Sequence, residues 1–336
     1  MHRPLLLDLT FLSMHPSDVL FQGKHQPVSL PVCDHYAGSE KLMRKSLALQ
    51  QQMGPVFDIT FDCEDGAAAG NEVAHARQVA ELIASPENRH DRVGVRVHDP
   101  SSAHFEQDVE IISAGAAQRL AYLVIPKAES LAQLRAAIAL VEQHATAAGR
   151  HDLPIHVLIE THGALHDVWD IAALKSVECL SFGIMDFVSA HHGAIPDTAM
   201  KSPGQFRHPL IIRAKIEIAA ACHAHGKIAS HNVCTDIRDL SVVAGDALEA
   251  AQSLGYGRMW SIHPDQIAPI VRAFAPAFEE TEDAAAILLA AQSAGWGPIQ
   301  YKSKLHDRAS YRYYWTVLQR AKRSGQSMPE AAGALM

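Results

Sequence analysis

The sequence predicts a closed eight-stranded β/α barrel with a helical extension at its C-terminal end. Eight short segments rich in Val, Ile, Phe and Tyr alternate with longer helical patterns. Most of these segments are apolar throughout, as are parallel strands that are buried on both faces. An open doubly wound sheet could give the same alternation, but eight strands favour the closed barrel. The expected strands are 31–33, 56–63, 93–98, 120–126, 155–160, 179–183, 228–232 and 259–263.

Helical patterns fill the intervals between these strands. Ser39, Ser130 and Thr235 stand where N-cap residues are expected, because serine and threonine hydroxyls can accept hydrogen bonds from the first turn. Gly54 and Gly226 stand where helices would end. The expected helices are 40–53, 71–84, 104–116, 131–147, 165–174, 206–225, 236–254 and 265–274, with 279–294 and 311–323 beyond the barrel.

The chain of 336 residues is longer than a bare barrel of roughly 250 residues. We therefore expect three parts: an N-terminal arm over 1–30, the barrel over 31–276, and a helical extension over 277–336 that serves as a lid or an intersubunit arm. The short apolar run at the start is interrupted by Asp8 and is interpreted as part of the arm rather than as a targeting segment.

The composition is that of a globular enzyme, with 48% apolar and 20% charged residues. A net charge of −8 argues against broad binding to nucleic acids or anionic membranes. Small anionic substrates remain compatible with it, because a few cations in a pocket can outweigh the global charge. Five cysteines without a CxxC pair predict reduced thiols and a cytoplasmic location.

Ionisable residues gather at the C-terminal ends of the expected strands, where barrel enzymes hold their chemistry. Glu160 and Asp186 form the clearest pair, because they follow consecutive strands and would meet at the mouth of the barrel. Two carboxylates completed by water and substrate oxygens suit Mg²⁺, with Mn²⁺ as an alternative. On pattern alone, helix capping or pairing with an arginine would explain each carboxylate equally well.

Arg96 stands between two valines in the expected third strand, so it must point into the mouth or pair with a buried acid. It could bind a substrate carboxylate or stabilise an enolate oxygen. An ion pair with Asp62 or Glu64 is the alternative, and the two roles can coexist. Glu64 and Asp65 follow the second strand and could support metal-bound water or accept a proton, or simply act as anions at a helix N-terminus.

Lys127 and the histidines are weaker candidates. Lys127 follows the fourth strand and could bring positive charge to an anionic ligand, while the neighbouring carboxylates disfavour a Schiff-base role. With 21 histidines in the chain, any single one is weak evidence. His191, His192 and His231 fall on the functional side, and His263 is expected to be structural.

Six motifs occur in the order seen in one enzyme family. Together they resemble the citrate lyase β-subunit and malyl-CoA lyase branch of the HpcH/HpaI aldolase superfamily, over about residues 55–276. The motifs are FDCEDGAAAGNEVAHAR ending at Arg77, GVRVHD around Arg96, IPKAE at 125–129, IETHGA at 159–164, FGIMDF at 182–187 and SIHPDQI at 261–267.

This resemblance implies a role for each matched residue. Glu160 and Asp186 would match the two Mg²⁺ ligands, and Arg96 the arginine that binds keto-acid or enolate oxygens. Glu64 and Asp65 fall in the family's acidic motif, where they would support metal-bound water. The resemblance also implies a homotrimer or homohexamer in which a C-terminal segment closes over a neighbouring active site.

Two segments depart from the family pattern. The usual Arg-Ser opening that leads to Pro-Gly is here PVCDHYAGSEK at 31–41, and the lysine four residues before Arg77 is Val73. Both changes affect residues that would hold coenzyme A, whereas the metal ligands are intact. The tail lacks the family's Asp-Lys-Pro stretch, and Asp307 is its best candidate for an acid supplied to a neighbouring site.

The expected function is a Mg²⁺-dependent carbon–carbon lyase acting on a 3-hydroxyacyl thioester of coenzyme A or an acyl carrier, of the malyl, citramalyl or citryl type. Retro-aldol or retro-Claisen cleavage would give an α-keto acid and an enolate stabilised by Arg96. A pyruvate-type aldolase acting on a free 4-hydroxy-2-keto acid is one alternative, although FDCEDG lacks the histidine usual in that branch. An accessory subunit of a lyase complex is another.

Overall fold

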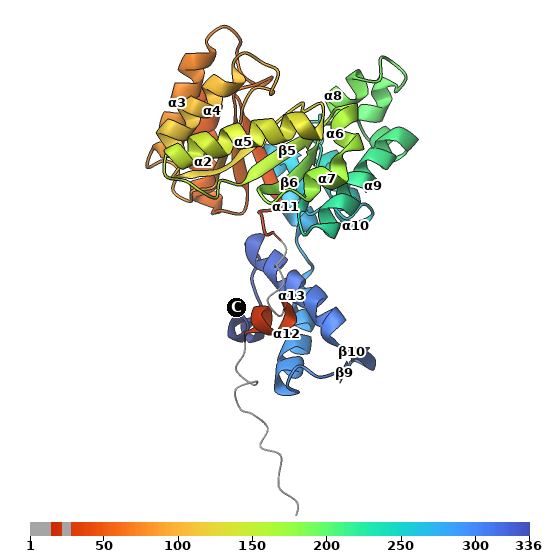
Figure 1. Cartoon of the computed structure of the whole chain (residues 1–336). Helices are drawn as coiled ribbons and strands as arrows, with labels where there is room; N and C mark the ends of the chain where they lie inside the picture. The colour runs from red at the N-terminus through yellow and green to blue at the C-terminus, as the bar shows by residue number, and fades with distance from the viewer. Residues whose placement is uncertain (1–14, 22–27) are drawn as a thin grey trace, which may run out of the picture. The chain divides into compact units, whose positions relative to one another are not determined.

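The computed structural model describes residues 15–21 and 28–336 (Figure 1). The chain divides into two compact units, one spanning Val28–Phe274 and the other combining the N-terminal segment with Ala275–Met336. Most of the expected N-terminal arm, residues 1–14 and 22–27, lies outside the described residues. No helix in the described part of the chain is both long enough and apolar enough to cross a membrane.

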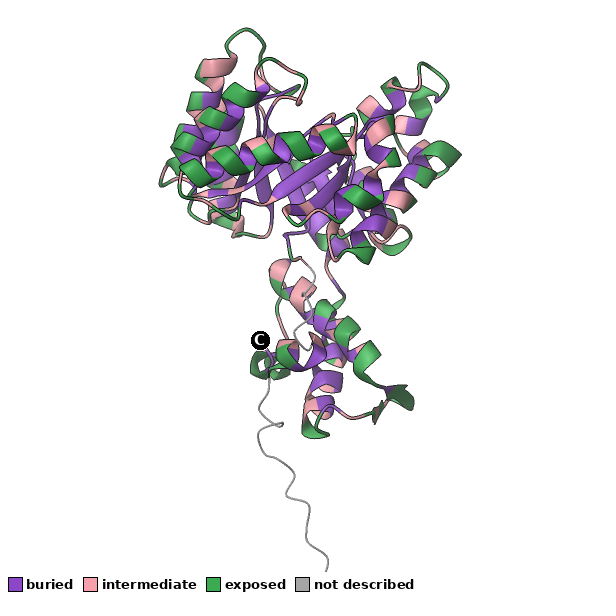
Figure 2. Ribbon diagram, viewed as in Figure 1, coloured by how far each residue is buried: buried purple, intermediate pink, exposed green. Residues whose placement is uncertain are grey.

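Eight parallel strands close into a barrel in sequence order, which confirms the predicted fold class. The barrel closes because the first strand pairs with both the second and the eighth. Figure 2 shows the strands buried and the helices exposed on their outer faces. The strands are β1 (Cys33–Ala37), β2 (Asp58–Asp62), β3 (Val93–Arg96), β4 (Leu120–Ile125), β5 (Ile155–Ile159), β6 (Val177–Phe182), β7 (Ile228–His231) and β8 (Arg258–Ser261).

The first strand lies further along the chain than the hydropathy predicts. The expected segment 31–33 ends where β1 begins, because β1 reads CDHYA and carries Asp34, His35 and Tyr36. Asp34 and His35 are both only 2% exposed, and Asp34 is ion-paired to Arg258 inside the barrel. A strand whose polar residues are neutralised by partners on other strands has no apolar signature.

Helices surround the barrel; two of the expected helices differ clearly from the prediction, and the short helix over Ile184–Ser189 was not expected. The expected helix 165–174 is split at Asp167, whose side chain accepts a hydrogen bond from Leu131 N. The expected helix 236–254 begins only at Leu240, because Asp239 rather than Thr235 is its N-cap. The barrel helices are α2 (Glu40–Met53), α3 (Glu72–Ala84), α4 (Phe105–Ala116), α5 (Leu131–Ala147), α6 (His162–His166), α7 (Val168–Ala172), α8 (Ile184–Ser189), α9 (Pro209–Ala224), α10 (Leu240–Gln252) and α11 (Pro264–Phe274), with 3-10 turns at Asp197–Met200 and Gly204–Phe206.

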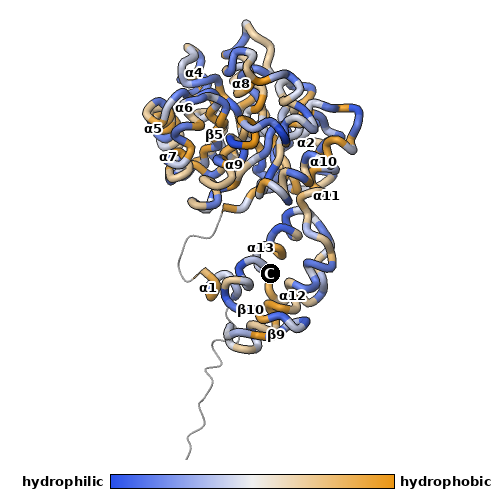
Figure 3. Tube along the Cα trace, turned by 90° about the vertical axis from the view of Figure 1, so that its right-hand side faces the viewer, coloured by the Kyte–Doolittle hydropathy of each residue, from blue (hydrophilic) through white to orange (hydrophobic). Residues whose placement is uncertain are grey.

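The second unit has its own hydrophobic core, formed by α12 (Phe278–Ser293), α13 (Arg308–Arg323) and the short α1 (Pro16–Phe21). Hydrophobic and hydrophilic stretches alternate along its helices (Figure 3). An unpredicted hairpin of β9 (Ile299–Tyr301) and β10 (Lys304–His306) joins the two long helices, and a 3-10 turn at Glu330–Ala334 follows them. Asp307, the candidate acid of the tail, caps α13 by accepting a hydrogen bond from Ala309 N.

Candidate active site

The six predicted site residues all lie just beyond or at the C-terminal ends of strands β2–β6. Arg96 ends β3, Lys127 follows β4, and Glu160 follows β5. Glu64 and Asp65 lie two and three residues after the end of β2. Asp186, expected at the end of the sixth strand, lies instead in the first turn of the short helix α8, because the strand stops at Phe182.

Arg96 is held in place by a two-point contact with Asp62, its register partner on β2. Its Nε donates to Asp62 Oδ1 at 2.8 Å and its Nη2 to Oδ2 at 2.6 Å, while Nη1 lies 3.0 Å from Glu64 Oε2. The structural ion pair offered as an alternative role is therefore present. Since a guanidinium has five N–H donors, further donors remain for a substrate oxygen.

Backbone donors and a glycine fix the other side of Asp62. Glu64 N and Gly66 N donate to its two carboxylate oxygens at 3.0 and 2.8 Å. A Cβ at position 66 would lie 2.2 Å from Asp62 Oδ2, so only glycine leaves room for this turn. The acidic loop after β2 is thus built around the carboxylate that orients Arg96.

Lys127 binds the acidic loop across the mouth. Its Nζ donates to Glu64 Oε1 and, at 2.7 Å, to Asp65 Oδ2, and it lies 3.8 Å from Asp186 Oδ1. Burial opposes its charge, but the hydrogen bonds to Asp65 and Glu64 hold the pKa of Lys127 above its ordinary value. The amine therefore stays protonated and serves as a point charge rather than as a nucleophile.

Glu160 is the least compensated carboxylate of the site. It is 2% exposed, and Lys127 N donates a hydrogen bond to its Oε1 at 2.8 Å. Burial and the charge of Asp186 raise the pKa of Glu160 to about 8. A Cβ at position 183 would lie 2.1 Å from Glu160 Oε2, so Gly183 makes the room in which this carboxylate lies.

The donor set suits a hard divalent cation held by few protein ligands. The described residues contain no group of three or more His, Cys, Asp or Glu side chains arranged to hold a metal ion. The buried, uncompensated Glu160 and the neighbouring Asp186 supply two carboxylates. Two carboxylates leave most of an octahedral shell for water and substrate oxygens, which is the usual Mg²⁺ arrangement.

The charges of the mouth do not balance. Two cations, Arg96 and Lys127, contact the site's carboxylates. Five carboxylates surround them, so the formal surplus is three negative charges when all five are ionised; they are Asp62, Glu64, Asp65, Glu160 and Asp186. A divalent cation would remove most of this surplus.

A cavity of about 400 Å³ lies beside the site. Glu64 and Lys127 line it together with His75 and His98. The prediction missed His98 as a candidate. Its position two residues after Arg96, at the end of the expected third strand, was the available signal.

The histidines that the prediction considered as weak candidates or as structural lie in other surroundings. His231 is fully buried with its Nε2 2.8 Å from Lys215 Nζ, where α9 packs on β7, so it is not positioned for substrate contact. His191 Nδ1 lies 2.7 Å from Phe187 O on its own helix turn. His263 lies 3.6 Å from Asp265 Oδ2.

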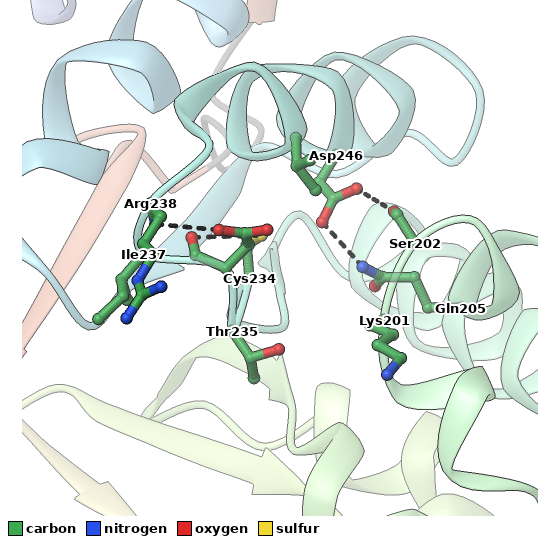
Figure 4. A pocket seen from close by; sticks show the side chains of 10 residues that line it. Lys201, Ser202, Gln205, Cys234, Thr235, Ile237, Arg238 and Asp246 are labelled. Carbon is green, nitrogen blue, oxygen red and sulfur yellow. Dashed lines mark hydrogen bonds between the residues drawn. The ribbon is translucent and has the colours of Figure 1, made fainter.

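A second pocket, of about 360 Å³, lies by the loops that follow β6 and β7. Figure 4 shows Ser202 and Gln205 hydrogen-bonded to Asp246, while the ends of Lys201 and Arg238 point away from that cluster. Both carboxylate oxygens of Asp246 have partners from this chain. This pocket therefore lacks the uncompensated carboxylate that marks the mouth beside Glu160.

The fold and the site define a β/α-barrel protein with an acidic, cation-attracting centre at the carboxyl ends of its strands. The chain belongs to the HpcH/HpaI aldolase/citrate lyase family, whose sequence model matches residues 43–264.

Relatives and solved structures agree with this assignment. An L-malyl-CoA/β-methylmalyl-CoA lyase of Rhodobacter capsulatus is 26% identical over 277 residues, covering 79% of this chain and 87% of the relative. A citrate lyase subunit beta-like protein of Mycobacterium tuberculosis is 27% identical over 264 residues, covering 78% and 87%.

Among solved structures, a citrate lyase from Burkholderia xenovorans LB400 is 57% identical, with a TM-score of 0.83 over 96% of this chain and 100% of that one. The protein CitE of Mycobacterium tuberculosis, in complex with magnesium, acetoacetate and coenzyme A, is 23% identical. Its TM-score is 0.65 over 89% of this chain and 99% of that one, which is a likeness of fold.

Proposed function

We propose that this protein is a Mg²⁺-dependent carbon–carbon lyase that cleaves or forms a 3-hydroxyacyl thioester of the malyl, citramalyl or citryl type. The observation that carries the proposal is the buried Glu160 beside Asp186, in a mouth with three surplus negative charges. The family, and relatives that are named as malyl-CoA and citrate lyases, support the same chemistry.

Glu160 and Asp186 would hold the cation, with Mn²⁺ as an alternative to Mg²⁺. When bound there, the cation supplies Lewis acidity to the oxygens of the substrate and lowers the pKa of its hydroxyl. Arg96, fixed by Asp62, stabilises the negative charge that develops on the enolate oxygen when the carbon–carbon bond breaks. Lys127 ties the acidic loop to the mouth through Glu64 and Asp65.

One observation favours a second candidate, a pyruvate-type aldolase acting on a free 4-hydroxy-2-keto acid. The cavity beside the site would have to admit the phosphates of coenzyme A if that carrier were used. Its lining includes the acids Asp65, Glu72 and Asp99. Among the described residues that line it, Lys127 is the only lysine or arginine. Since that amine is already bound to Glu64 and Asp65, little positive charge remains for phosphates.

We further propose a cytoplasmic homotrimer or homohexamer, in which Ala275–Met336 forms a lid or an intersubunit arm. All five cysteines are free and buried, as expected in a reducing compartment. Sedimentation analysis of the purified protein, with and without residues after Phe274, tests the assembly: loss of the trimer or hexamer on truncation supports the arm.

The test of function is a cleavage assay of the purified protein with malyl-CoA, citramalyl-CoA and free 4-hydroxy-2-keto acids, each with Mg²⁺ and with a chelator. Mg²⁺-dependent cleavage of a thioester supports the lyase. Cleavage of the free acids alone moves the protein to the pyruvate-aldolase branch. Mg²⁺ binding without any turnover points to an accessory subunit and contradicts the proposal.

A further inference from the structure

A histidine–aspartate pair lies in the wall of the cavity beside the site. His98 follows Arg96 by two residues, at the same end of the barrel. Asp108, in α4, accepts from His98 twice at one oxygen: the backbone N lies 3.0 Å and the ring Nδ1 2.6 Å from Asp108 Oδ2. The residue Asp108 is only 1% exposed.

This contact sets the state of the imidazole ring. An ionised carboxylate can only accept hydrogen bonds, so the proton of the neutral ring lies on Nδ1. Nε2 then carries the free lone pair, and the buried carboxylate behind Nδ1 orients the ring. If Asp108 only anchored the loop, its hydrogen bond from the backbone N of His98 would be sufficient. The second bond, from the ring, is the one that orients the imidazole.

The position of the pair connects it to the proposed reaction. His98, Glu64 and Lys127 line one cavity of about 400 Å³, so a molecule bound against the acidic loop reaches the imidazole as well. His104 lies nearby, with its ring centroid 5.1 Å from that of His98. The charged and titratable groups facing this region come from the loops after β2, β3 and β4 and from α3 and α4; they are Glu64, Asp65, Glu72, His75, Asp99, His104, Asp108 and Lys127.

We propose that His98, oriented by Asp108, transfers the proton of the reaction at its Nε2; this inference rests on the lyase function proposed above. In cleavage, Nε2 takes the proton of the substrate hydroxyl, the O–H electron pair forms the carbonyl, and the carbon–carbon bond breaks. The electron pair of that bond forms the enolate. The imidazolium then returns the same proton to the enolate carbon, so the histidine is neutral again and no proton is consumed.

Hydrogen exchange measures the proton transfer between His98 and the enolate carbon separately from carbon–carbon cleavage. The full-length protein, loaded with Mg²⁺, is incubated in D₂O with pyruvate and separately with acetyl-CoA, and loss of the methyl protons is followed by NMR. Removing a general base costs about 100-fold or more in rate. We expect His98→Gln to lose exchange and kcat by this factor, with KM changed by no more than about threefold.

Two further variants separate proton transfer from a structural role. Asp108→Asn keeps an acceptor for the backbone N but favours the wrong tautomer of the ring, and we expect it to lose exchange as His98→Gln does. His98→Ala opens space in the cavity, so added imidazole should restore exchange. His104→Gln is the matched control, because His104 is a neighbouring histidine outside the cavity lining, and it should keep the wild-type rate.

The outcomes distinguish this inference from the function on which it rests. Wild-type cleavage and exchange, lost in His98→Gln and restored by imidazole in His98→Ala, support the inference. An active wild type whose His98→Gln variant exchanges as fast as the wild type overturns the inference alone. So does a result in which both variants are slowed and His98→Gln is no slower than His104→Gln. A wild type that binds Mg²⁺ but neither cleaves nor exchanges overturns the proposed function and the inference together.

Discussion

Two clusters of charge lie inside the same barrel and differ in balance. Near the start of the strands, the fully buried Arg258 pairs with Asp34 and Asp58, and Arg92 lies 2.6 Å from Asp58. This floor cluster has two arginines and two aspartates, so its formal charge is zero. The cluster at the mouth has five carboxylates and two cations, and the ion pairs of these cations are with Asp62, Glu64, Asp65 and Asp186 rather than with Glu160.

The comparison separates structural charge from functional charge. In the floor cluster each ion has an opposite partner within the chain, as a buried ion needs if the fold is to tolerate it. In the mouth, burial and the charge of Asp186 raise the pKa of Glu160. We therefore expect the surplus of charge at the carboxyl ends of the strands to mark the place where a cation binds.

The largest effect is expected from substitutions that change the mouth cluster and leave the floor cluster intact. Glu160→Gln and Asp186→Asn should each lower Mg²⁺-dependent kcat by about 1,000-fold or more, because the loss of a metal ligand removes several kcal/mol of transition-state stabilisation. Neither should unfold the barrel, since each substitution removes a surplus charge. Steady-state kinetics and circular dichroism check both statements, and a loss below tenfold would contradict the assigned ligands.

Breaking the floor cluster should affect stability instead. Arg258→Met leaves Asp34 without its ion-pair partner and Asp58 with Arg92 alone, and removing one side of a buried ion pair costs about 3–5 kcal/mol. Urea unfolding measures the change in the free energy of unfolding. In protein that remains folded, Mg²⁺ affinity should stay within about twofold of wild type; an Arg258→Met protein as stable as wild type would show that the floor is not structural.

The pH dependence of stability sharpens the comparison at the barrel wall. Burial lowers the pKa of His35, whose Nδ1 lies 3.0 Å from Ser261 Oγ, to about 4. The unfolded chain takes up this proton near pH 6.5 and the folded one only near pH 4, so the stabilisation is present above pH 6.5 and is lost as pH falls towards 4.

The difference between the pKa of His35 in the unfolded and folded chains corresponds to about 3 kcal/mol of folding free energy. Urea unfolding between pH 4.5 and 7.5 should show a shallower slope for His35→Gln than for wild type. The exposed His166 offers the control, because His166→Gln should keep the wild-type slope. Parallel slopes for all three proteins would refute the assignment to His35.

The smallest effect concerns the sign of the charge imbalance. Lys127→Met removes a cation that lies 3.8 Å from Asp186, so it should tighten Mg²⁺ binding by about 1 kcal/mol, or fivefold, while lowering kcat. Calorimetry at fixed ionic strength measures the affinity. Weaker Mg²⁺ binding in Lys127→Met would mean that the amine helps to build the site rather than competing with the cation.

Much of the fold is predictable because burial on both faces makes parallel strands apolar throughout. The prediction was least accurate where side chains inside the barrel are polar, as in β1 with Asp34 and His35. The predicted start of α10 was wrong because Asp236 accepts hydrogen bonds from Arg238 N and Asp239 N. These bonds hold a turn where a helix was expected. The β9–β10 hairpin lacks a buried face and has no strong strand pattern.

For the site, position along the strands was sufficient to select Glu160, Asp186 and Arg96 as candidates. It could not show which carboxylates have partners, because the contact between Asp62 and Arg96 depends on strand register. His98 was missed because the signal of any one histidine is weak among 21, and because its partner Asp108 is ten residues away on a helix. Charge balance depends on the distances between carboxylates and cations, and these distances are defined only in the folded chain.

The most direct test of the central claim is Mg²⁺ titration calorimetry on the wild type, Glu160→Gln, Asp186→Asn and His104→Gln. The account predicts one Mg²⁺ site per chain in the wild type and in His104→Gln, and no measurable binding in the other two. Unchanged Mg²⁺ affinity in Glu160→Gln and Asp186→Asn would contradict it, because the surplus charge of the mouth would then have another purpose.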